Sequence, residues 1–249
     1  MQETVVENPY GLGALIAQGN IVSRSILAIL LIMSLLTWFI MITKFFDQRR
    51  QRLQAIEAEK EFWNSSSLTD AISKLKGGSN PFRALAETGK QAYEYHEVNK
   101  SRLSSAIGTS EWITESLQRT ADMVISRMQA GLPVLASVGA TAPFVGLLGT
   151  VIGIYNALIA IGVAGQASID KVAGPVGEAL IMTAIGLAVA VPAVLGYNVL
   201  LRRNKAVQER VSHFTHELHA YLISGVKMGL GMEKGPTPVG KPAAAAPAR

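Results

Sequence analysis

One acidic side chain stands alone beside a long apolar stretch of this 249-residue chain. Glu178 is followed directly by residues 179–201, none of which is charged. An ionised side chain deep in a bilayer costs about 2.5 kcal/mol or more, so such residues normally face a protein interior or a wet cavity. Glu178 is therefore our first candidate for lining a polar path. The alternative is a solvated carboxylate at the outer interface, because Arg202 lies about 36 Å further along a helix.

Three other polar side chains can be paired with positions at the same depth. Suppose that the turn between the second and third apolar stretches is centred near residue 166.5. Two residues whose numbers add to 333 then lie at equal depth. Thr150 and Thr183 form one such pair, and Tyr155 and Glu178 form another. We expect the threonines to form one polar layer and Tyr155 to hydrogen-bond Glu178. Thr183 and Glu178 lie about 140° apart around a helix. A bond from Thr183 to a backbone carbonyl therefore remains an open alternative.

The residue types that support catalysis or metal binding are scarce. The chain has no cysteine, which excludes disulfides, cysteine metal sites and a thiol nucleophile. His213, His216 and His219 have a spacing that could hold a metal, but apolar residues surround them and an amphipathic helix explains them better. No nucleophile–base pair is recognisable. We predict neither an enzyme, nor a metal site, nor a cofactor.

Membrane spans must position these candidate residues. Hydrophobic residues make up 49% of the chain, charged residues 16%, and the mean hydropathy is +0.28, whereas soluble domains carry about 25% charged residues. The stretches 25–43, 128–169 and 179–201 contain no charge. Runs of this length are typical of transmembrane helices. The net charge of +5 is therefore not a nucleic-acid signal, and we predict no nucleic-acid partner.

Basic clusters indicate the orientation of the spans. They follow the first apolar stretch, precede the second and follow the third, at Lys44–Arg52, Arg119–Arg127 and Arg202–Lys205. Because Lys and Arg concentrate on the cytoplasmic side, we predict an external amino terminus and a cytoplasmic carboxyl terminus. The basic clusters also suit contact with anionic lipid headgroups. The predicted division is an external segment 1–20, transmembrane helix 21–43, cytoplasmic helical domain 44–127, a second transmembrane helix with a cytoplasmic extension 128–164, external loop 165–173, a third transmembrane helix 174–201, cytoplasmic helix 202–228 and disordered tail 229–249.

The cytoplasmic stretch 44–127 is predicted to be helical, with 13 basic and 11 acidic residues. A break at 65–67 precedes a short helix that ends at Gly77-Gly78. Asn80 is a helix cap, and Pro81 suits the first turn of the helix that follows. A last helix runs from about Ser101, and we expect it to continue into the second span.

Small residues distinguish the second and third spans from the bulky first span. Gly146, Gly149 and Gly153 lie in the second span, and Gly186 in the third. Without water to expel, membrane helices pack through small residues that let their backbones approach. We expect the second and third spans to form a tight inner layer, with the first facing lipid. Three spans enclose little, so we expect packing between copies rather than a self-contained monomer.

Two long motifs resemble a known family. They are 139–154, GATAPFVGLLGTVIGI, and 174–188, GPVGEALIMTAIGLA, followed by Val191-Pro-Ala193 and Tyr197-Asn198. All three spans, and the cytoplasmic part between the first two, resemble the MotA/TolQ/ExbB proton-channel family. Within it the chain looks most like the ExbB branch, and the TolQ branch is the close alternative because it shares both motifs.

The resemblance implies an all-α protein of the bacterial inner membrane that assembles as a ring, expected to be a homopentamer, around a central pore. An ExbD-like subunit would occupy the pore. Proton-motive force would drive motion passed to a TonB-like protein, and so to uptake of iron complexes and vitamin B12. By match to the motifs, Thr150 and Thr183 carry over as polar pore residues near the proton path, and Glu178 as the acidic pore residue.

Two rival interpretations use the same residues differently. A structural scaffold would only hold its partners in the membrane, and Glu178 and the threonines would then be packing elements. A secondary transporter would need more spans or an internal repeat, and the sequence shows neither.

Overall fold

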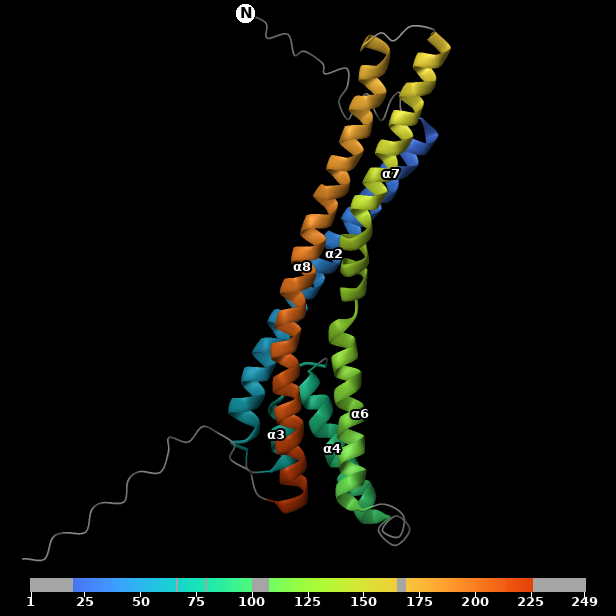
Figure 1. The fold of residues 1–249 in the computed structure, drawn as a ribbon. Helices are drawn as coiled ribbons and strands as arrows, with labels where there is room; N and C mark the ends of the chain where they lie inside the picture. The colour runs from blue at the N-terminus through green and yellow to red at the C-terminus, as the bar shows by residue number, and fades with distance from the viewer. Residues whose placement is uncertain (1–19, 66, 79, 100–107, 165–168, 226–249) are drawn as a thin grey trace, which may run out of the picture.

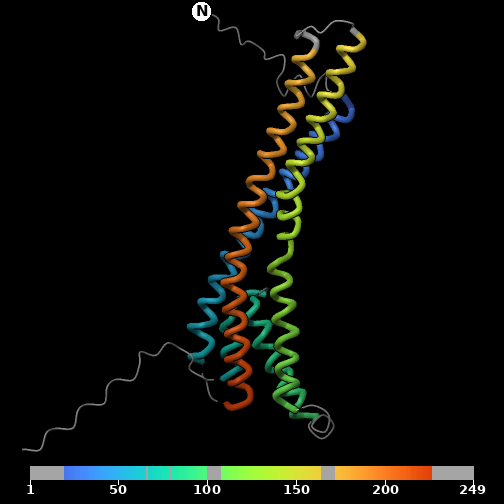
Figure 2. The backbone as a smooth tube through the Cα atoms, viewed as in Figure 1, coloured from blue at the N-terminus to red at the C-terminus, as the bar shows by residue number. Residues whose placement is uncertain are grey.

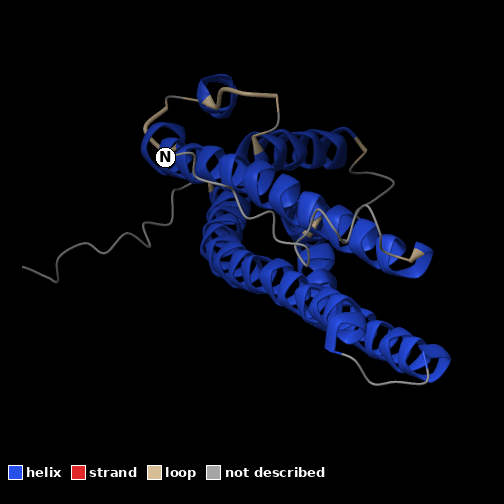
Figure 3. Cartoon of the chain, turned by 90° about the horizontal axis from the view of Figure 1, so that it is seen from above, coloured by secondary structure: helices blue, strands red, loops and turns tan. Residues whose placement is uncertain are grey.

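The computed structural model describes residues 20–65, 67–78, 80–99, 108–164 and 169–225. Seen from above, this part of the chain contains helices and loops only (Figure 3). Three helical stretches, Ile21–Phe62, Thr109–Val163 and Val172–Ser224, are long and apolar enough to cross a membrane. The expected all-helical class with three membrane-compatible helices is confirmed. The predicted tail 229–249, nearly all of the segment 1–20 and part of the loop 165–173 lie outside the described residues.

One end of the elongated molecule is built from three helices. There α7 (Leu132–Ala164) and the first half of α8 (Ile169–Ser224) lie side by side, and the first half of α2 (Ile21–Glu57) crosses behind them (Figure 1). With 56 residues, α8 is about 84 Å long, against about 30 Å for the hydrocarbon core of a bilayer. It therefore runs the length of the molecule, as the backbone tube shows (Figure 2).

The other end is a helical bundle. The second halves of α2 and α8 are joined there by the π-helical turn η1 (Ala58–Phe62), α3 (Leu68–Lys74), α4 (Pro81–Val98) and α6 (Thr109–Gln129). Its core contains Phe62, Phe82 and Phe214, with ring centroids 4.9 Å apart for Phe62–Phe214 and 5.3 Å for Phe82–Phe214. Burial of aromatic side chains contributes strongly to the stability of such cores.

Local signals begin the bundle helices, and the predicted cap at Asn80 with Pro81 after it is confirmed. Ser67 caps α3 by accepting a bond from the Asp70 amide, and Gly77 follows with φ of +99°. Asn80 caps α4 by accepting bonds from the Phe82 and Arg83 amides, with Pro81 in the first turn. Cap side chains satisfy amides that have no partner inside the helix.

The prediction that one helix continues from the cytoplasmic part into the second span is wrong. α6 ends at Gln129, α7 begins at Leu132, and Gly131 between them has φ of +86°. Glycine adopts this left-handed conformation without the steric cost of a Cβ. The break frees carbonyls at the end of α6. Asn204 Nδ2 donates to the Met128 carbonyl at 2.9 Å, and Lys44 Nζ donates to the Arg127 carbonyl at 3.1 Å.

The third helix differs from its predicted boundaries. The sequence division placed a loop at 165–173, a span at 174–201 and a cytoplasmic helix at 202–228. In the structure α8 begins at Ile169 and continues to Ser224 without a break, with Pro175 and Pro192 inside it. The helix therefore starts earlier than predicted, whereas its continuity past residue 201 does not conflict with the predicted boundary, because a membrane boundary leaves the backbone hydrogen bonds of a helix intact.

Candidate functional site

The site is built where α7 and α8 approach most closely. A Cβ on Gly146 would lie 2.8 Å from the Met182 carbonyl oxygen, and one on Gly186 would lie 2.7 Å from the Ala142 carbonyl oxygen. Gly149 and Gly153 face α8 in the same way, with Met182 and Ala179 as their neighbours. These four glycines let the two backbones come together, as small residues do in membrane helix packing.

A pair of threonines bridges the two helices beside this crossing. The Thr150 and Thr183 hydroxyls contact each other. Thr150 Oγ1 also donates toward the Ala179 carbonyl oxygen on α8 at 3.1 Å and toward the Gly146 carbonyl oxygen in its own helix at 3.3 Å. The equal-depth rule thus places this pair correctly. The alternative in which Thr183 bonds a backbone carbonyl is not the arrangement found, because the Thr183 hydroxyl contacts Thr150.

Glu178 lies one residue before the carbonyl that Thr150 bonds. Its side chain is partly buried, and its Oε1 atom is buried without a hydrogen-bond partner among the described residues. A buried carboxyl oxygen without a partner is costly. Among the described residues this oxygen therefore stands out as a position where a polar partner would be stabilising.

The expected hydrogen bond from Tyr155 does not reach Glu178 Oε1. The Tyr155 side chain is 62% exposed. Gly153 is the residue that faces α8 at this level, and Tyr155, two positions later, lies about 200° around the helix. Equal depth therefore brings the two residues to one level but to different faces.

The chemistry available at the site is limited to hydrogen bonding and proton exchange. It offers two hydroxyls and one carboxyl group along the α7–α8 crossing. Within the described ranges, no group of three or more His, Asp or Glu residues could hold a metal. His219 Nε2 instead lies 3.1 Å from Ser110 Oγ, as expected for an ordinary residue of the bundle.

A family model for the MotA/TolQ/ExbB proton channel family matches residues 83–213. This chain belongs to that family. The matched range holds most of α4, all of α6 and α7 and most of α8, and so includes the threonine pair, Glu178 and the glycine crossing. The family is one of proton channel and transport subunits.

Curated relatives extend the match over most of the chain. It is similar to biopolymer transport protein ExbB of Xanthomonas campestris pv. campestris, 41% identical over 83% of this chain and 84% of the relative. It is also similar to ExbB of Neisseria meningitidis, 38% identical over 83% of this chain and 94% of the relative. Tol-Pal system protein TolQ of Pseudomonas aeruginosa is 35% identical over 89% of this chain and 96% of the relative.

A buried polar pair outside the site was not predicted from the sequence. Gln48 Nε2 donates to Asn204 Oδ1 at 2.6 Å and to the Leu200 carbonyl at 2.8 Å. Both side chains are buried, although they lie in charged stretches that resemble solvated helix faces. The Gly131-Leu-Pro133 sequence is the signal that could have revealed the helix break, and with it the need for a donor such as Asn204 at the end of α6.

Proposed function

We propose that this chain is the ring-forming stator subunit of a proton-driven motor of the ExbB type in the bacterial inner membrane. The ring, which we propose is a pentamer, surrounds an ExbD-like subunit and passes motion to a TonB-like protein. The amino terminus is periplasmic and the carboxyl terminus cytoplasmic. The motor energises TonB-dependent uptake of iron–siderophore complexes and vitamin B12 across the outer membrane.

The polar layer at the α7–α8 crossing is the observation that carries this proposal. The Thr150–Thr183 pair offers hydroxyls inside an apolar segment, and Glu178 Oε1 is buried with no hydrogen bond from the part of the chain that the structure describes. We assign all three residues to the surface that faces the pore and its proton path. The missing partner of Glu178 is then water or a polar group of the ExbD-like subunit.

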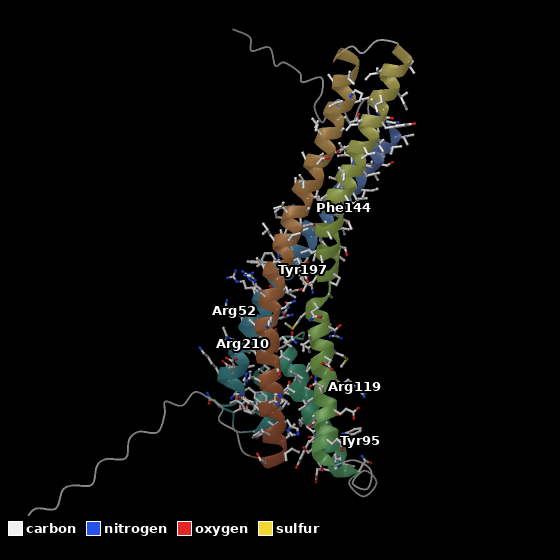
Figure 4. All side chains as sticks on the ribbon, viewed as in Figure 1. Arg52, Tyr95, Arg119, Phe144, Tyr197 and Arg210 are labelled. Atoms are coloured by element: carbon white, nitrogen blue, oxygen red, sulfur yellow. The ribbon has the colours of Figure 1, made fainter. Side chains whose placement is uncertain are left out.

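The exposed surface of the apolar helices supports assembly with other chains. Phe144 on α7 is 71% exposed (Figure 4), and Val151 and Leu180 are also largely exposed. Large apolar patches mark contacts with protein or lipid. Tight α7–α8 packing leaves these side chains free for neighbouring copies, pore helices and bilayer.

The energy available suits a small movement rather than the breaking of an interface. One proton crossing 100 mV releases about 2.3 kcal/mol. Breaking a helix interface would require several hydrogen bonds and many packing contacts to be lost together. The energy of one proton is enough to bias the rotation of pore helices against the polar layer of this surface, while the glycine-packed α7–α8 crossing stays intact.

The test is energised vitamin B12 uptake in cells whose own subunit is replaced by this chain, with its partner genes supplied. Thr150→Ala and Glu178→Gln should each lower uptake on the order of tenfold, the equivalent of about 1.4 kcal/mol for one interior hydrogen bond. The matched controls are Thr43→Ala, whose hydroxyl bonds only its own helix, and Glu115→Gln, an exposed acid. Full uptake in both site variants, at normal protein levels, would refute the assigned roles.

Two alternatives predict other outcomes. A TolQ-type role is favoured by the similarity to the Pseudomonas aeruginosa protein, and it predicts rescue of envelope integrity in a strain lacking the Tol-Pal subunit but no rescue of uptake. A scaffold predicts that the conservative Glu178→Gln change leaves uptake intact.

A further inference from the structure

A cavity rich in arginine lies between α2 and α8, where their apolar stretches end. It has a volume of about 580 Å³ and is lined by Arg49 and Arg52 from α2 and by Arg202, Arg203 and Arg210 from α8. In Figure 4, Arg52 and Arg210 project from the same edge of the molecule. Five cationic side chains on two adjacent helices repel one another unless an anion neutralises them.

The described protein supplies little of that negative charge. Glu59 pairs with Arg210 at 3.3 Å. Within the described ranges, Arg49, Arg52, Arg202 and Arg203 form no salt bridge with a carboxylate. The Arg203 guanidinium instead lies 4.8 Å from the centre of the ring of Phe45, which also lines the cavity, in a cation–π interaction.

An apolar groove adjoins the cavity on the side of the membrane-spanning segments. It has a volume of about 750 Å³, lies between the same two helices and shares Phe45 with the arginine cavity. Its walls include Met41, Ile42, Val191, Leu195 and Val199. A cationic cavity at a span boundary and an apolar groove running from it toward the bilayer thus form one continuous surface.

We propose that this surface binds one anionic phospholipid. Its phosphate lies among Arg49, Arg52, Arg202 and Arg203, and an acyl chain lies in the groove beside Leu195. Guanidinium groups bind phosphate through paired N–H···O bonds and are well suited to partly buried sites. A zwitterionic lipid would bring its own cation into a cavity that is already positive. That the lipid belongs to the cytoplasmic leaflet rests on the orientation in the proposed function.

The test is native mass spectrometry of the full chain, purified from nanodiscs of equal phosphatidylcholine and phosphatidylglycerol. Phosphatidylglycerol should be retained preferentially, at one per chain. The double variant Arg202→Gln/Arg203→Gln should weaken retention about 25-fold, since each cation near a membrane surface is worth about 1 kcal/mol, or about fivefold. The control Arg83→Gln/Arg119→Gln removes the same charge from bundle side chains paired with Glu87 and Glu115.

Two outcomes of that experiment would overturn the proposal. One is equal retention of the two lipids by the unaltered chain, and the other is an equal loss in the pocket and control variants. Leu195→Trp tests the groove without changing charge. It should lower phosphatidylglycerol retention by obstructing the acyl chain, and unchanged retention would contradict an acyl chain at this position.

A cross-linking experiment identifies the occupant directly. Because the chain has no cysteine, Leu195→Cys can carry a single benzophenone label. Illumination in the same nanodiscs should produce a lipid adduct, seen as a mass increase of one phosphatidylglycerol. Adducts to a second copy alone would show that a protein neighbour fills the groove and would refute the lipid. These binding measurements do not depend on uptake, so failure of the motor assay leaves them interpretable.

Discussion

Replacing Gly186 with alanine tests the packing that holds the site together. A Cβ at this position would lie 2.7 Å from the Ala142 carbonyl oxygen and 3.0 Å from the Gly146 Cα atom. Both neighbours are backbone atoms of α7, so neither can rotate away. We expect Gly186→Ala to push α7 and α8 apart and to destabilise the chain.

The expected magnitude follows from that geometry. Ordinary contact begins at 3.4 Å, so the Cβ is 0.7 Å too close to the Ala142 oxygen. If the helices move apart by this distance, their other contacts open, and a gap of 0.5–1 Å forfeits roughly a quarter to a half of each van der Waals contact. Overpacking a tight site costs about 1–3 kcal/mol in total. Alanine also favours the helix over glycine by about 1 kcal/mol, which must be removed by a matched control.

Gly174→Ala is that control, because a Cβ on this α8 residue meets nothing within 4 Å. The helix-propensity gain is common to both variants, so Gly186→Ala should be less stable than Gly174→Ala by about 1–3 kcal/mol. Thermal unfolding of the full chain in detergent, followed by circular dichroism, measures this difference. At about 2–4 °C per kcal/mol for a chain of this size, the midpoints should differ by about 2–12 °C.

A third glycine sharpens the comparison. A Cβ on Gly196 would contact the Met41 Sδ atom, and a methionine side chain is flexible enough to move aside. Gly196→Ala should therefore unfold between the other two. If Gly186→Ala proved as stable as Gly174→Ala, the close backbone crossing would be refuted.

Two further changes test the joint between α6 and α7. Asn204→Leu should lower the stability of the chain by about 1–3 kcal/mol, because it leaves the buried Met128 carbonyl without its donor. Its control is Asn64→Leu, at an exposed turn, which should change the stability by less than about 0.5 kcal/mol. The same unfolding assay compares the two variants. Gly131→Ala should cost about 1–2 kcal/mol because of its φ of +86°, and Gly78→Ala, which meets nothing, is its control. Equal midpoints within either pair would contradict the described joint.

Much of the architecture could be predicted from residue type and spacing. Uncharged stretches locate the three long apolar helices, because burial of charge in a bilayer is costly wherever it occurs along the chain. Asn80 and Pro81 identify the start of α4 because capping depends on neighbouring residues only. The continuation past Arg127 was predicted wrongly. A glycine permits a break without requiring one, and the capping donors Lys44 and Asn204 come from distant parts of the sequence.

In the candidate site, too, some features could be predicted from the sequence and others depended on how the helices pack. Counting from the turn between two antiparallel helices gives depth, and it correctly paired Thr150 with Thr183. The same count placed Tyr155 beside Glu178, where the expected bond to Oε1 is absent. Depth depends on helical rise alone, but contact also depends on rotation around each axis. Rotation is set by which glycines face the partner helix.

The sequence by itself determined the apolar helices, their polar exceptions and the family motifs, because these depend on local composition and order. Only the tertiary structure decided that α6 and α7 are separate, that Gln48 and Asn204 are buried together, and that arginines from α2 and α8 line one cavity. Residues about 150 positions apart, such as Arg52 and Arg202, become neighbours only when helices pack. Packing depends on the shapes of facing surfaces, which no single stretch of sequence contains.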